Sequence, residues 1–141
     1  MERREWLSIL ATAPPERLLT LAEPFSRPVE TLRAPEIGSV MVRGRAGGTG
    51  AAFNLGEMTV TRASVQLGDA VGHGHVQGRS RPAAEAAALL DALLQGDEAG
   101  AIQRDVLAPL QRERAEARRL RAAKAEATKV NFFTLVRGEV E

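Results

Sequence analysis

A glycine-rich segment at residues 44–50, with the sequence Gly-Arg-Ala-Gly-Gly-Thr-Gly, has residue types that bind phosphate groups. Consecutive glycines allow backbone N–H groups to converge on an anion, and flanking arginines can donate paired hydrogen bonds to phosphate oxygens. A P-loop or a dinucleotide-binding turn would need a helix directly after the glycines, whereas residues 53–67 favour an extended strand. An anion-binding loop and a flexible connection with positive φ angles therefore both stay open. The candidate residues are Arg43, Arg45, Gly47, Gly48, Thr49 and Gly50.

Further candidate anion-binding residues lie where a predicted strand gives way to a predicted helix. Gln77 and Arg79 could direct polar groups toward a ligand or another chain there, close to the positive end of the helix dipole. The alternative is an ordinary strand end with a solvated arginine, and both interpretations stay open. Arg62, on the preceding predicted strand, completes the candidate set.

Two histidines, His73 and His75, are separated by one residue on a predicted strand, so both side chains point to one face, as two metal ligands would. The chain has no other histidine and no cysteine, and no third ligand is indicated. We therefore expect two partly exposed polar residues and no metal site. No serine lies in a nucleophile-elbow context, and with two histidines and no tyrosine the usual acid/base side chains are scarce, so we expect no catalytic residue in this chain.

The carboxyl-terminal segment at residues 129–138 is apolar, although it follows a helix without a broad apolar face. It contains two of the four phenylalanines, and a terminal segment is polar or frayed unless something binds it. One alternative is folding back onto the chain's own core. Docking on another subunit is favoured, because the polar helix would hold the segment away from that core. The candidate interface comprises Val130, Asn131, Phe132, Phe133, Leu135, Val136 and Arg137.

The elements that position these residues are predicted from hydrophobic periodicity and from turn residues. Helices are predicted over residues 2–12 and between Pro15 and Pro24. Roughly four strands follow, and their connections are too short to hold crossover helices. The prediction is an α+β fold in which helices precede and follow a four-stranded antiparallel meander, with strands at residues 29–35, 38–45, 57–67 and 70–77.

A helix after Pro82 is predicted to cover this sheet, with Asp91 and Gln95 away from its apolar stripe. Gly96 ends this helix, and a shorter helical turn continues up to Pro109. The apolar stripe of the covering helix comprises Ala86, Leu89, Leu90, Leu93 and Leu94.

The last part of the chain is predicted to be a polar helix at residues 110–129, rich in alanine, arginine and glutamate, followed by the apolar segment. This helix cannot bury a broad face. We therefore predict a compact α+β domain at residues 1–108 and a helical arm with an apolar tail, for subunit docking, at residues 109–141.

The composition excludes several classes of protein. A length of 141 residues suits one domain, and the absence of cysteine excludes disulfide-stapled secreted domains and cysteine-ligated metals. The balance of 19 basic and 18 acidic residues argues against nucleic acid as a partner, and no apolar stretch is long enough to cross a membrane. Glu2 and Glu5 argue against a signal peptide, so a cytoplasmic protein is expected.

Several segments together resemble the PhnG family of the phosphonate carbon–phosphorus lyase system. The resemblance extends from Trp6 to Gly138, which is essentially the whole chain. Asn131 stands where an aspartate is usual in the family, which puts a charge-dependent role there in doubt. His73 and His75 fall where the family pattern requires no histidine. The matching segments are Arg45 with Gly47-Gly48-Thr49-Gly50, Thr59, Thr61-Arg62-Ala63, Val65, Val76-Gln77-Gly78-Arg79, Ala84-Glu85, Asp91-Ala92-Leu93, Ala108-Pro109-Leu110 and the segment from Val130 to Gly138.

The resemblance implies a subunit of the carbon–phosphorus lyase core complex, a hetero-oligomer with PhnH, PhnI and PhnJ that contains two copies of this chain. With PhnH, PhnI and the ATPase-like PhnL, such a subunit would be needed to form α-D-ribose 1-methylphosphonate 5-triphosphate from ATP and methylphosphonate. These two compounds are substrates of the complex, and no cofactor is expected on this chain alone. The preferred role is structural or accessory. The alternative is direct binding of phosphate or phosphonate in a shared active site through the arginines and the glycine-rich segment.

Overall fold

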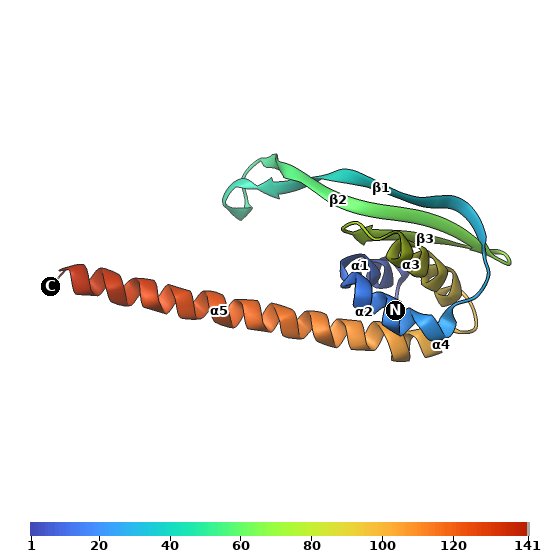
Figure 1. Ribbon diagram of the computed structural model, residues 1–141. Helices are drawn as coiled ribbons and strands as arrows, with labels where there is room; N and C mark the ends of the chain where they lie inside the picture. The colour runs from blue at the N-terminus through green and yellow to red at the C-terminus, as the bar shows by residue number, and fades with distance from the viewer. Residues whose placement is uncertain (141) are drawn as a thin grey trace.

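A computed structural model shows a three-stranded antiparallel sheet with helices packed on one of its faces (Figure 1). The structure describes the backbone of residues 1–140 and the side chains of residues 1–129. The α+β prediction is confirmed. In chain order the elements are α1 (Arg3–Thr12), α2 (Pro15–Ala22), η1 (Glu23–Phe25), β1 (Glu30–Arg45), η2 (Ala46–Gly48), β2 (Ala52–Leu67), β3 (Ala70–Gln77), α3 (Arg81–Leu94), α4 (Ala99–Ile102), the π-helical segment η3 (Gln103–Leu107) and α5 (Ala108–Val140).

The prediction of four strands is wrong, because residues 29–35 and 38–45 contribute to one continuous strand, β1. The turn predicted around Pro35 is instead an irregularity within this strand, where the register against β2 shifts between Arg33 and Glu36. β1 lies at the edge of the sheet. Edge strands and bulges tolerate proline, which cannot donate to the hydrogen-bond ladder. Proline therefore interrupts the ladder here without ending the strand.

The distal halves of β1 and β2 form a two-stranded hairpin, which we call the hairpin arm (residues 39–59). β3 pairs only with residues 60–67 of β2, whereas β1 pairs with β2 as far as the turn. The hairpin arm therefore extends beyond the helices and the third strand, as Figure 1 shows. Its turn contains Gly47 and Gly48 at φ angles of 62° and 80°, which confirms the positive φ angles considered for the glycine-rich segment.

α3 approaches β3 closely because glycine occupies two positions of β3 that face the helix. A Cβ atom at Gly72 would lie 1.9 Å from the carbonyl oxygen of Ala88, and one at Gly74 would lie 2.0 Å from that of Ala84. Small residues on both elements therefore let the two backbones meet without large side chains between them. The leucines of the predicted α3 stripe are buried in the core.

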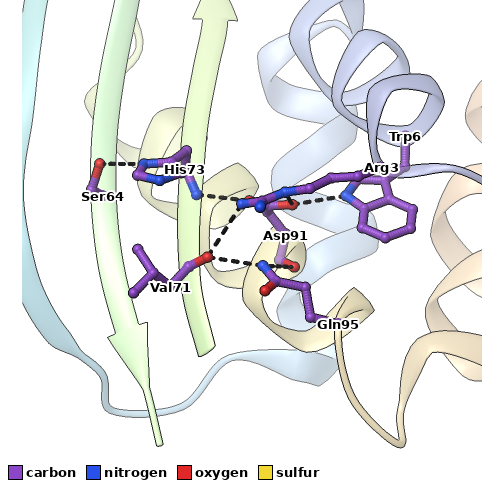
Figure 2. A network of polar contacts seen from close by, with 7 residues as sticks. All are labelled: Arg3, Trp6, Ser64, Val71, His73, Asp91 and Gln95. Atoms are coloured by element: carbon purple, nitrogen blue, oxygen red, sulfur yellow. Dashed lines mark hydrogen bonds and ion pairs between the residues drawn. The ribbon is translucent and has the colours of Figure 1, made fainter. Parts of the chain in front are cut away.

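Asp91, which the sequence pattern places away from the apolar stripe of α3, is fully buried. Its carboxylate accepts hydrogen bonds from the Trp6 indole at 2.8 Å, from the His73 backbone N–H at 2.8 Å and from the Arg3 guanidinium at 2.8 Å (Figure 2). These contacts explain the burial, since a buried carboxylate is tolerated when hydrogen bonds and an opposite charge compensate it. Hydrogen bonding to Asp91 also raises the pKa of Arg3 above its usual value. The network joins α1, β3 and α3.

α5 leaves the core soon after it begins. Helical conformation runs through Pro109, where we predicted that a helical turn would end, because proline is accommodated in the first turn of a helix. Leu110 is buried, but from residue 111 to residue 129 every side chain except Arg114 is exposed. Residues 111–140 extend about 45 Å at the usual rise of about 1.5 Å per residue. Figure 1 shows α5 projecting from the core on the same side as the hairpin arm.

None of the helices in the described part of the chain is both long and apolar enough to cross a membrane.

Candidate functional site

The candidate residues of the glycine-rich segment lie at the tip of the hairpin arm. Arg43 and Arg45 are exposed and lie opposite residues 54 and 52 of β2, whereas Gln77 lies opposite residue 60 of the same strand. Positions 54 and 60 are about 20 Å apart at the usual rise of about 3.3 Å per residue. The structure therefore does not bring Arg43 or Arg45 together with Gln77 around one small anion. An anion-binding role for Arg43, Arg45, Gly47, Gly48, Thr49 and Gly50 stays a prediction.

Arg62, His73 and His75 lie on the sheet face that the helices leave uncovered. Arg62 pairs with His75 in the register between β2 and β3, and the Nδ1 atom of His73 lies 2.8 Å from the Ser64 hydroxyl. The two histidines are exposed on one face, as predicted. Among the residues whose side chains are described, no three His, Cys, Asp or Glu side chains are grouped to hold a metal ion.

The turn that carries Arg79 is anchored by Thr61 of β2. The buried Thr61 hydroxyl donates to the Gly78 carbonyl at 2.7 Å and accepts from the Ser80 backbone N–H at 3.2 Å. Ser80 in turn caps α3 by accepting a hydrogen bond from the Ala83 backbone N–H. Arg79 itself is exposed. The hydrogen bonds of Thr61 thus fix the backbone of the turn, and the Arg79 side chain stays accessible to a ligand or another chain.

The predicted partner interface lies on the projecting part of α5. The helix continues through the predicted apolar tail as far as Val140. The interface stays a prediction, because the side chains of Val130, Asn131, Phe132, Phe133, Leu135, Val136 and Arg137 lie outside the described ones.

The hairpin arm has an exposed apolar face that the sequence patterns did not reveal. Residues paired in an antiparallel sheet share a face, and successive residues alternate between faces. By this rule Val40 and Met58 lie on the face opposite the helices. A Cβ atom on Gly44, which shares this face, would lie 2.9 Å from the Leu55 side chain, and Leu55 is 61% exposed. We define the hairpin apolar face as Val40, Val42, Phe53, Leu55 and Met58.

A second surface missed by the sequence reasoning is a groove of about 450 Å³ between the start of α5 and the junction of α1 with α2. Three arginines of α5 line it, and their i, i+4, i+7 spacing places them on one side of the helix. That spacing is the sequence signal that could have found them. Gln77 lines the same groove. This candidate residue therefore lies beside arginines of α5, and not beside Arg43 and Arg45 as expected from the sequence. We define the arginine groove by Arg17, Gln77, Arg114, Arg118 and Arg121.

Comparison with known proteins gives two matches that span nearly the whole chain. The model of a family described as phosphonate metabolism protein PhnG matches residues 1–138. A curated protein of Rhizobium meliloti (strain 1021), α-D-ribose 1-methylphosphonate 5-triphosphate synthase subunit PhnG, is 43% identical over 145 aligned positions. The alignment covers 98% of this chain and 90% of that relative.

Proposed function

This chain belongs to the PhnG family, and from that premise we propose that it serves in phosphonate metabolism as an accessory, partner-binding subunit of an α-D-ribose 1-methylphosphonate 5-triphosphate synthase. The synthase is a transferase, and the chemistry of bond formation belongs to the assembled complex. No residue of this chain is assigned an independent catalytic role.

The exposure of α5 is the observation that carries the accessory role. From residue 111 to residue 129 every side chain of α5 except Arg114 is exposed, and a helix exposed in this way gains little stability from its own domain. Such a helix fits a role in bridging to another subunit. The apolar residues expected at positions 130–137 would then meet a partner about 30–40 Å from the core, at the usual rise of about 1.5 Å per residue.

The hairpin apolar face supports the same role. Two-stranded hairpins are marginally stable in water without further packing, and this one exposes Phe53 and Leu55 instead of covering them. Apolar side chains gathered on an arm that projects from the core are typical of a surface that another protein covers. The hairpin arm and α5 project on the same side of the core (Figure 1). A partner subunit would have room to bind between them or along either one.

The proposed partners are the PhnI-, PhnJ- and PhnH-like subunits, with PhnL acting functionally in the same pathway. The proposal includes a hetero-oligomer with two copies of this chain, located in the cytoplasm, and no nucleic acid or membrane as partner. ATP and methylphosphonate would be substrates of the complex, with no cofactor held by this chain alone. The family membership supports the pathway and the partner subunits, and the absence of cysteine fits a reducing compartment such as the cytoplasm.

Replacing both Phe132 and Phe133 by alanine is expected to abolish co-purification of the chain with its partner subunits, because the apolar end of α5 would lose its anchoring side chains. The core should stay folded, since α5 leaves it well before these positions. Co-expression followed by affinity purification measures the first effect, and circular dichroism of the isolated variant measures the second.

The matched control is Leu32→Ala, which removes a side chain that is 48% exposed from the start of β1, away from both arms. This variant should co-purify like the unmodified chain. Complex formation that survives the double phenylalanine substitution would contradict the proposed role of α5.

A further inference from the structure

The arginine groove is walled by residues from three separate parts of the chain. α5 contributes Arg114, Arg118 and Arg121, α2 contributes Arg17, and Gln77 stands at the end of β3. Its floor is apolar, because the buried side chains of Ile9, Ala13 and Leu110 line it as well. An apolar floor lowers the local dielectric and strengthens the interaction of the surrounding arginines with an anion.

The groove carries a clear excess of positive charge. Its one acidic lining residue, Glu113, forms an ion pair with Arg17 at 2.8 Å. None of the three α5 arginines forms an ion pair with a residue whose side chain is described, and Arg114 only donates a long hydrogen bond of 3.4 Å to the Ser8 hydroxyl. Three guanidinium groups are therefore left to bind an external anion.

The spacing of these groups selects an extended anion. From Arg114 to Arg121 the helix rises about 10 Å, at about 1.5 Å per residue, so an extended anion matches the spread of the three arginine positions better than a single phosphate does. A chain of linked phosphates is such an anion, and each guanidinium offers a paired donor geometry that matches phosphate oxygens.

We propose that the arginine groove is a binding site for a polyphosphate chain, with Arg114, Arg118 and Arg121 as its phosphate ligands. The biological source of the ligand rests on the proposed function, because the compound that names the related synthase carries a 5-triphosphate. The site binds and orients the anion and carries out no bond-making step. It is separate from the arginines at the tip of the hairpin arm.

The test is calorimetric titration of the full-length chain with inorganic triphosphate. The chain should bind triphosphate more tightly than orthophosphate, and a variant with both Arg118→Ala and Arg121→Ala should bind it about tenfold more weakly or worse, since it loses charge-assisted hydrogen bonds to the anion. The variant Glu113→Gln should bind more tightly, because it removes the one negative charge and releases Arg17. ATP as a second titrant distinguishes a nucleoside triphosphate from the free anion.

Arg119→Ala is the matched control on the same helix, because Arg119 pairs with Glu116 and does not line the groove. Its affinity for triphosphate should equal that of the unmodified chain. Equal weakening by Arg119→Ala, or no preference for triphosphate over orthophosphate, would overturn the proposal. Unchanged triphosphate binding by the Arg118/Arg121 variant together with lost co-purification would overturn it too, since the groove would then be a protein contact. Failure of the proposed function would appear separately, in the co-purification of the Phe132/Phe133 variant.

Discussion

Replacing Gly74 by alanine is expected to prevent stable folding of the whole chain. The added Cβ would lie 2.0 Å from the Ala84 carbonyl oxygen and 2.8 Å from the Ala88 backbone nitrogen. Both are backbone atoms of α3, so no side chain can rotate away, and the helix would have to separate from the sheet. Overpacking of this kind costs about 3 kcal/mol or more, a large share of the roughly 5–15 kcal/mol that stabilises a typical domain. Urea unfolding of the purified variant, or its absence from the soluble fraction, measures the effect.

Gly38→Ala is the matched control for this substitution. Gly38 also lies in a strand, β1, but a Cβ atom there would meet nothing within 4 Å. Its stability should be unchanged or slightly higher, because alanine reduces the conformational freedom of the unfolded chain. An unfolding midpoint of Gly74→Ala equal to that of Gly38→Ala would show that α3 does not pack on β3 as described.

Replacing Asp91 by alanine should have the second largest effect. The substitution leaves the Trp6 indole N–H and the His73 backbone N–H without their acceptor at a buried position. Each unsatisfied buried donor costs about 1–3 kcal/mol, so a loss of about 3 kcal/mol or more is expected. Trp6 is the only tryptophan of the chain, so the tryptophan fluorescence reports directly on this hydrogen-bond network. Chemical unfolding followed by tryptophan emission is the measurement.

Arg3→Ala provides the comparison within the same network. The Arg3 side chain is 44% exposed, so solvent screens its ion pair with Asp91 and its removal should cost no more than about 1 kcal/mol. A double-mutant cycle of the two positions gives their coupling directly. If Asp91→Ala destabilises the chain no more than Arg3→Ala does, the hydrogen bonds from Trp6 and His73 to Asp91 do not stabilise the fold as described.

Asp91 also illustrates where sequence reasoning stops. The predicted helices α1, α2 and α3 and the strands β2 and β3 are present, because each has a clear hydrophobic period or a clear turn at its ends. The same pattern places Asp91 away from the apolar stripe of α3 and gives no sign of its burial, since a charged residue is rarely buried. Its burial depends on Trp6 and Arg3, which lie more than 80 residues away in the sequence. No local pattern contains that information.

β1 shows a different limit of sequence reasoning. Pro35 and Gly38 are the residues of a turn, and only the position of β1 at the sheet edge allows them to lie inside a strand. The sequence pattern likewise indicates only strand positions at Gly72 and Gly74, because the close approach of α3 that requires glycine there is a tertiary contact.

The candidate site was predicted less completely than the fold. The sequence drew attention to arginine, to Gln77 and to the carboxyl-terminal helix, and their roles stay predictions. It grouped residues that the long hairpin separates. It indicated a positive cluster on the helical arm at residues 112–121, but it did not join Arg114, Arg118 and Arg121 to Gln77, beside which they line one groove. Convergence of side chains from distant elements is set by tertiary packing, which neither spacing nor composition encodes directly.

The central claim, that this chain acts as an accessory partner-binding subunit, is tested most directly by adenine release from ATP and methylphosphonate. The measurement compares the reconstituted complex containing the unmodified chain with a complex whose chain carries Arg45→Ala and Arg79→Ala. The account predicts equal rates of adenine release from the two assembled complexes and no release when the chain is omitted. Loss of adenine release by a fully assembled Arg45/Arg79 complex, or full release without the chain, would contradict it.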